Sequence, residues 1–150
     1  MPNSYLSEVG NEKYSTELSG IGGKLRHTPD DFEVREISII PSLSPTGKYT
    51  VAKVTSRNWE TNTLLRILAK YLGIYSERIG FAGTKDKRAV TTQLLSFPIG
   101  EKQVSNLDIK DVTIDILGKT NRKIKLGELV GNDFTIKITN TKNAKEFLPP

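Results

Sequence analysis

Regular alternation of apolar and polar side chains is the feature that most constrains how this chain can fold. Four such segments occupy residues 32–37, 49–54, 112–117 and 134–138. A period of two places every second side chain on one face, which predicts half-buried β-strands. Two shorter segments, residues 79–82 and 93–97, are also expected to form strands. The chain is therefore expected to be built around a sheet.

Residues 61–72 have the spacing of an amphipathic helix instead. Its apolar positions are Leu64, Leu65, Leu68, Ala69 and Leu72. Thr61, Asn62 or Thr63 is expected to cap the start of this helix, and Gly73 to end it. A second helix is expected to begin within residues 142–148. We therefore predict an α+β fold with a mixed, largely antiparallel sheet and packed helices.

Composition excludes several classes of site. The 150 residues contain no Cys and a single His, and 22 Lys and Arg outnumber 17 Asp and Glu. Disulfides and Cys-ligated metals are thereby excluded, and a His-cluster metal site or a Ser-His-Asp triad is disfavoured. The net charge of +5 suggests a polyanionic partner. No apolar run approaches the roughly 20 residues of a membrane helix, and no secretory signal is visible, so a cytoplasmic location is expected.

The segment between the two short strands concentrates charge around one carboxylate. Asp86 is flanked by Lys85, Lys87 and Arg88. Nearby cations favour an ionised carboxylate and are expected to lower its pKa. An ionised Asp on a loop is a usable nucleophile, and the same cations can hold a phosphate backbone. The alternative is a solvated turn in which Asp86 forms only weak surface ion pairs.

A family resemblance favours the functional interpretation. Residues 82–93, AGTKDKRAVTTQ, resemble the AGxKDxxAVTxQ signature of the TruD family of tRNA pseudouridine synthases. The Asp of this signature is the catalytic nucleophile of the family, which implies that role for Asp86.

Two further segments resemble motifs of the same family. Residues 24–36 are similar to its K-x-x-PEDFxVxE motif, which implies a basic contact for Arg26 and a pocket wall for Phe32. Residues 117–136 are similar to its KLRLGxLxGNxFxIxLR motif, which implies that Asn132 contacts the substrate and that Phe134 lies near the flipped base. Thr139 stands where the motif ends in Arg.

The same residues have physical interpretations of their own. The Asn132 amide can donate to and accept from the imide edge of uracil, and the Phe134 ring can stack on a base. Lys119, Arg122, Lys123 and Lys125 can follow phosphates. The alternatives are that Phe32 and Phe134 belong to the core and that Asn132 lies in the turn of a basic hairpin.

The resemblance implies isomerisation of a uridine in tRNA, at position 13, to pseudouridine. Asp86 would attack the sugar C1′ or abstract a ribose proton to give a glycal, and the sequence leaves both open. The reaction needs no redox step or external energy, so no cofactor and no metal are expected. Two other functions remain open, a catalytically silent RNA-binding module and a basic domain whose charges only solvate it.

The expected domain organisation is a polar N-terminal extension at residues 1–19, followed by the N-terminal portion of a TruD-type catalytic domain at residues 20–150. Family members continue with an NYFGxQRFG motif, the rest of the catalytic domain and an inserted domain, none of which is in this sequence. We therefore expect marginal stability, or dependence on a C-terminal portion supplied separately.

Overall fold

The computed structural model describes residues 22–141, of which Lys24–Thr139 form a compact unit. The expected extension at residues 1–19 and the expected helix within 142–148 lie outside the described residues. The helices are η1 (Pro29–Asp31), α2 (Thr61–Leu72), η2 (Ser76–Arg78) and α3 (Glu101–Ser105), where η denotes a 3-10 helix. The strands are β1 (Phe32–Ser38), β2 (Tyr49–Arg57), β3 (Gly80–Phe81), β4 (Val90–Phe97), β5 (Val112–Thr120) and β6 (Leu129–Ile136).

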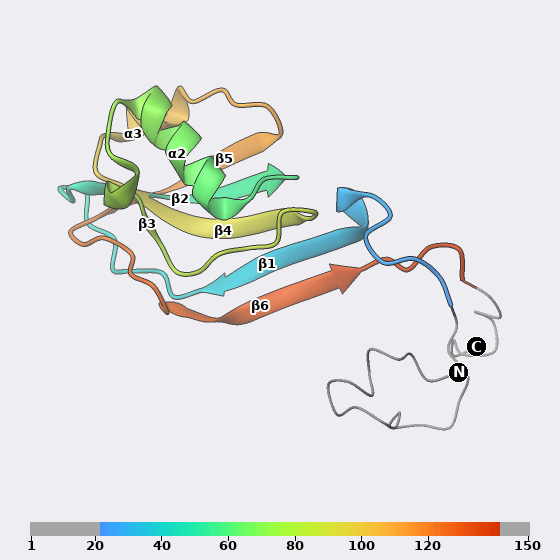
Figure 1. The fold of residues 1–150 in the computed structure, drawn as a ribbon. Coiled ribbons are helices and arrows are strands. Elements are labelled where there is room, and N and C mark those ends of the chain that lie inside the picture. Colours follow the sequence, from blue (N-terminus) through green and yellow to red (C-terminus); the bar gives the residue numbers. More distant parts are fainter. Residues whose placement is uncertain (1–21, 142–150) are drawn as a thin grey trace. The chain divides into compact units, whose positions relative to one another are not determined.

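The six strands of the described residues belong to one sheet, in the order β5-β2-β4-β1-β6, with β3 paired to the C-terminal end of β4 (Figure 1). Within residues 22–141, β1 and β4 are the one parallel pair, and the other four strand pairings are antiparallel. The predicted α+β class with a mixed, largely antiparallel sheet is therefore confirmed. The parallel pair matters for function, because it places the residues that precede β1 beside those that precede β4.

Most strand predictions were correct in place but too short. The strands β2, β4 and β5 extend beyond the expected ranges. The short helices α3, η1 and η2 were not predicted, because three to five residues are too few to show a helical period in the sequence. The last strand was misplaced, since β6 begins at Leu129 rather than Phe134. Gly131, Asn132 and Asp133 are weak strand formers, and their extended conformation comes from pairing with β1.

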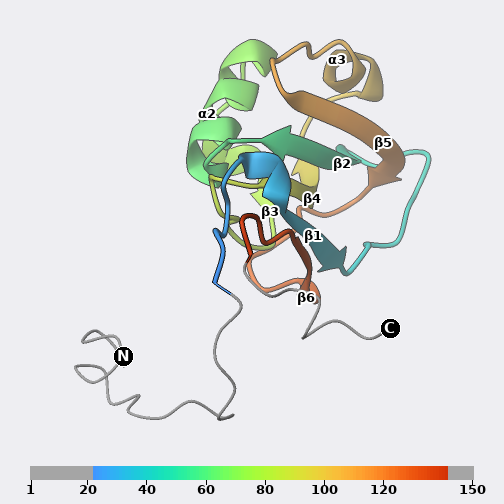
Figure 2. The same ribbon diagram turned by 90° about the vertical axis from the view of Figure 1, so that its right-hand side faces the viewer.

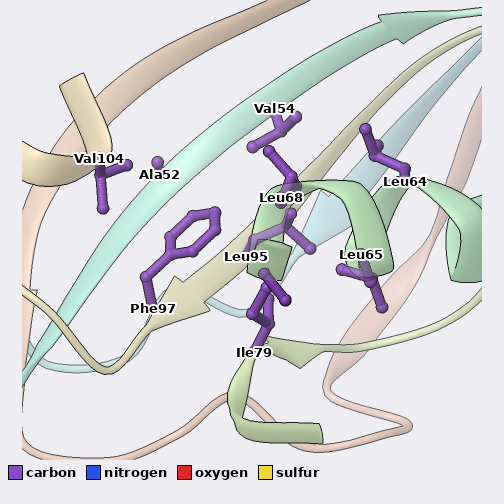
Figure 3. Packing of buried hydrophobic residues seen from close by; sticks show 10 residues of the cluster. Ala52, Val54, Leu64, Leu65, Leu68, Ile79, Leu95, Phe97 and Val104 are labelled. Atoms are coloured by element: carbon purple, nitrogen blue, oxygen red, sulfur yellow. The ribbon is translucent and has the colours of Figure 1, made fainter. Parts of the chain in front are cut away.

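The main core lies between α2 and the sheet. In Figure 3, Leu64, Leu65 and Leu68 of α2 face Val54, Leu95 and Phe97 of the sheet. Figures 1 and 2 show α2 and α3 on the same side of the sheet, over the half formed by β2, β4 and β5. Among the described residues, no helix covers the β1–β6 half on that side, and the loop between β3 and β4 lies there instead.

The start of α2 corrects one sequence prediction. The cap is Glu60, whose carboxylate accepts hydrogen bonds from the amides of Asn62 at 2.9 Å and Thr63 at 2.8 Å. Thr61 is the first helical residue, and its hydroxyl accepts a hydrogen bond from the backbone of Lys85. The predicted end was correct, since Gly73 takes a left-handed conformation with φ 68°.

The Glu60 cap gives a testable pH dependence. Hydrogen bonds from the amides of Asn62 and Thr63 hold the pKa of the Glu60 carboxyl below its usual value. The stabilisation is therefore complete above the ordinary pKa of about 4.5 and is lost as the pH falls through the lower folded-state pKa. Glu60→Ala is expected to cost about 1 kcal/mol of unfolding free energy at pH 7. Urea denaturation at pH 7 and pH 3 measures this, and the wild-type advantage over Glu60→Ala should shrink in acid.

The matched control is Glu60→Gln, which keeps an acceptor oxygen but cannot ionise. Its stability relative to Glu60→Ala should not change between the two pH values. An acid-sensitive difference between Glu60→Gln and Glu60→Ala would show that another group causes the effect.

Candidate active site

The strand register brings three segments that are distant in the sequence together at one end of the neighbouring strands β4, β1 and β6. The parallel pair starts with Glu33 opposite Val90, so the chain before β1 lies beside the loop before β4. The antiparallel pair places Phe32 opposite Ile136, so the end of β6 lies beside the start of β1. The three family-like motifs therefore converge although they lie far apart in the sequence.

Asp86 lies in the loop between β3 and β4, and its side chain is 49% exposed. The nearest cation is Arg26, whose Nη2 atom is 3.4 Å from a carboxylate oxygen of Asp86. The sequence had suggested that its three basic neighbours surround this carboxylate. The structure instead supplies an arginine sixty positions away in the chain, which the parallel strand pair brings close.

An aromatic support lies behind this ion pair. The Arg26 guanidinium carbon is 3.9 Å from the centre of the Phe32 ring, a cation–π contact. The Phe32 ring meets Phe134 edge-on, with ring centres 5.9 Å apart. Phe32 is buried, as the core interpretation required, whereas Phe134 is half-exposed. Asp86, Arg26, Phe32 and Phe134 thus form one continuous set of contacts.

Arg88 holds the backbone of the Arg26 segment in place. Its Nε atom donates to the carbonyl of Arg26 at 2.8 Å, and its Nη2 atom donates to the carbonyl of His27 at 2.7 Å. Arg26 has a positive φ of 52°, a conformation that non-glycine residues rarely adopt. Two hydrogen bonds from the Arg88 guanidinium therefore stabilise the backbone turn at Arg26.

Lys85 differs most from its expected role as a phosphate contact. Its ammonium group is buried and lies 2.7 Å from a carboxylate oxygen of Glu36. A buried and paired ammonium is not available to an RNA backbone. Lys87 is exposed beside Trp59 and Thr63, and of the three basic neighbours only its side chain forms no hydrogen bond or ion pair within the described residues.

Asn132 and Phe134 both lie on β6 and, being two residues apart, point to the same face of the sheet. They pair in register with Glu36 and Val34 of β1. Both are exposed, which differs from the hairpin alternative that placed Asn132 in a turn and Phe134 in the core. The two side chains are thus open to a ligand on the face where Lys85 and Glu36 meet.

The basic run before β6 is already partly engaged. Arg122 pairs with Glu128 at 2.6 Å and holds the pKa of the Glu128 carboxyl below its usual value. Lys123 donates to the backbone carbonyl of Glu77 in η2. Among residues 22–141, no group of three or more acidic or His side chains is placed to hold a metal ion, and no helix is long and apolar enough to cross a membrane.

Comparison with known proteins shows the family of this chain. A family model described as tRNA pseudouridine synthase D (TruD) matches residues 8–148. The chain belongs to the TruD family. The resemblance read from the three motifs is therefore confirmed, because this match extends over nearly the whole sequence.

Individual relatives give the extent of the similarity. A probable tRNA pseudouridine synthase D of Methanococcoides burtonii is 46% identical over 132 residues, covering 87% of this chain and 30% of that protein. The Archaeoglobus fulgidus relative is 38% identical and is covered to 34%. The crystal structure of a putative tRNA pseudouridine synthase D of Methanosarcina mazei matches with a TM-score of 0.89 and 38% identity, covering 98% of this chain and 34% of that one. The chain thus spans about a third of the length of these relatives.

The sequence analysis missed one residue of this candidate site. Glu36 closes the K-x-x-PEDFxVxE motif, but an acidic residue in an alternating strand is normally assigned to the solvent face. Its partner Lys85 is forty-nine positions away. The family motif was the available signal, since it includes this Glu.

Proposed function

We propose that this chain provides the nucleophile and part of the base pocket of a tRNA pseudouridine synthase. The observation that carries the proposal is the placement of Asp86, half-exposed and paired with an arginine that stacks on Phe32. An ionised carboxylate held beside an aromatic surface is suited to act on the sugar of a nucleotide whose base lies on that surface. Family membership favours this chemistry over a solvated turn.

The base would be held on the β6 side of the site. The exposed part of the Phe134 ring offers a stacking face, and such stacking contributes about 1–3 kcal/mol per base. Asn132, on the same face, can both donate to and accept from the imide edge of uracil. The largely buried Phe32 ring contacts both Phe134 and Arg26 and would hold them in place for the base. These contacts would offset the cost of unstacking the target uridine.

Two first steps are compatible with this arrangement. In one, an Asp86 oxygen forms a bond to C1′ as the N1–C1′ bond breaks, and the electron pair leaves with the uracil. In the other, Asp86 takes a ribose proton and the uracil leaves to give a glycal. In the first route, C5 of the turned uracil bonds to C1′ as the Asp86–C1′ bond breaks. In the second, C5 bonds to C1′ of the glycal as Asp86 returns the proton to the ribose. In both, the uracil then loses its C5 proton and gains a proton at N1. Both routes are isomerisations and require no cofactor.

The substrate contacts proposed outside the pocket are electrostatic. Lys87 and Arg88 are both exposed residues, although two nitrogens of the Arg88 guanidinium donate to the Arg26 and His27 carbonyls. These side chains, with Arg26, would meet the phosphates that flank the target, which we propose to be uridine 13 of tRNA. Family relatives and the basic composition support an RNA substrate.

A remaining portion of the enzyme, in the same or a separate chain, is proposed to complete the site. Within the described residues β6 pairs only with β1, and Phe134, Ile136 and Ile138 are exposed along this edge. An uncovered apolar edge strand is a surface that proteins normally cover. The relatives are about three times longer than this chain, which supports a covering segment from their remaining sequence.

The test is to incubate unmodified tRNA with the chain, alone and together with the remaining portion of the Methanosarcina mazei relative, and to map pseudouridine. We expect product at one uridine. We also expect tRNA affinity to fall steeply with salt, because Lys and Arg side chains of the protein displace counterions from the tRNA phosphates. Binding without product in either mixture would indicate the silent RNA-binding module. Salt-insensitive or absent binding would contradict both.

A further inference from the structure

A buried ion pair lies directly beside Asp86. The Lys85 ammonium is 2.7 Å from a Glu36 oxygen, and the two side chains are only 3% and 0% exposed. Lys85 also donates to the Gly83 carbonyl at 3.2 Å. The other carboxylate oxygen of Glu36 accepts from the Ser38 hydroxyl at 2.7 Å and from the Leu94 amide at 3.4 Å. The pair is therefore well hydrogen-bonded on both sides.

This pair differs from every other ion pair within residues 22–141. Each of the other four has both side chains at least 20% exposed. Exposed pairs contribute little, whereas burying two charges is costly and an apolar pair of similar volume is often as stable. Stability alone is thus a weak reason for charges at this place, and a role in the neighbouring site is the better explanation.

The pair anchors the residue before Asp86 to two separate elements. The Lys85 side chain is tied to β1 through Glu36, and the Lys85 backbone amide donates to the Thr61 hydroxyl at 2.8 Å, at the first turn of α2. A loop residue fixed at both its amide and its ammonium has little freedom to move. The anchoring therefore reaches Asp86 through a single peptide bond.

The same contacts determine which way Asp86 points. The Lys85 side chain turns inward, while the Asp86 side chain is 49% exposed and turns toward Arg26. With Lys85 engaged by Glu36, Arg26 is the one cation of the described residues within ion-pair distance of Asp86. Removing Glu36 would free the Lys85 ammonium next to the carboxylate and release the loop.

We propose that Glu36, acting through Lys85, is the positioning residue that fixes the orientation of the Asp86 carboxylate. Glu36 touches neither the proposed substrate nor Asp86. It acts by holding the neighbouring residue inward, so that the carboxylate stays outward beside Arg26 and Phe32. The effect on turnover rests on the proposed function, whereas the effect on the loop does not.

The first experiment compares Glu36→Gln and Lys85→Met in the preparation that forms pseudouridine. We expect the single-turnover rate to fall by about 100-fold, the usual result of a misplaced catalytic group, with tRNA affinity within about 3-fold of wild type. The matched control is Glu33→Gln, the same change two residues away on β1, where the carboxylate pairs with exposed Arg35. This control should keep the wild-type rate.

A second variant guards against simple unfolding. The double variant Glu36→Leu with Lys85→Met replaces both charges by apolar groups and should melt close to wild type. We expect its rate to remain as low as that of the single variants, because its loop has lost the anchor. Recovery of the wild-type rate in the double variant, or parallel losses of rate, affinity and melting temperature in the single variants, would overturn the proposal.

Amide hydrogen exchange on the isolated chain separates this proposal from the function. In Glu36→Gln, the Lys85 amide should lose protection while the amides of α2 keep theirs. Unchanged protection at Lys85 would overturn the positioning role whatever the enzyme does. Loss of protection at Lys85, in a protein that forms no Asp86-dependent product, would support the positioning role and contradict the proposed function.

Discussion

Replacing Asp86 by Asn is expected to abolish pseudouridine formation, with the rate falling by at least about 10³-fold. An amide has nearly the shape of the carboxylate but is a poor nucleophile and a poor base, so either proposed first step fails. Affinity for tRNA should stay within a few-fold of wild type, because the proposed phosphate contacts come from cations rather than from Asp86. Product per tRNA in single turnover and the dissociation constant at fixed salt measure the two quantities.

The matched control is Asp30→Asn. Asp30 is also an exposed aspartate paired with an arginine, since its carboxylate lies 3.0 Å from the Arg57 guanidinium. This variant loses a comparable surface ion pair and should keep full activity. Product formation by Asp86→Asn would remove the nucleophile assignment, and equal inactivation of Asp30→Asn would assign the effect to lost surface charge instead.

The features predictable from the sequence are those encoded locally. The apolar spacing of residues 61–72 and the following Gly73 predicted α2 and its end, because both depend on contacts within a few positions. Alternating segments predicted where strands occur for the same reason. The cap was missed because Glu60 is an unusual capping residue, and its carboxylate reaches Asn62 and Thr63 with a longer side chain than Thr or Asn.

The partners of charged residues in the site could not be predicted, because they depend on which strands are neighbours. The signature placed Lys85 and Arg88 beside Asp86 in the sequence, but one turned inward to Glu36 and the other to the Arg26 and His27 carbonyls. Both outcomes follow from the parallel β1–β4 pair, and the alternating pattern contains no information about strand order or direction. The family resemblance named the regions, and the register determined which side chains meet.

Phe97→Ala is expected to be the most destabilising single truncation in the core, costing about 3–5 kcal/mol of unfolding free energy. Phe97, the last residue of β4, is the largest side chain that is fully buried among the described residues, at 0% exposure. It belongs to the core cluster that includes residues of α2 and Val104 of α3 (Figure 3). Truncation removes the ring and leaves a cavity that a close-packed core cannot fully close. Urea denaturation with a single transition for wild type measures the loss.

The informative control is the same substitution at Phe134. That ring is 51% exposed and touches Phe32 only by its edge, so Phe134→Ala should cost less than about 1.5 kcal/mol of stability. It should instead weaken tRNA binding by the loss of a stacking surface, about 1–3 kcal/mol. Phe97→Ala, measured at a temperature where it remains folded, should bind tRNA as wild type does. If Phe134→Ala also lost several kcal/mol of stability with unchanged binding, Phe134 would be a core residue and the base would have to be held elsewhere.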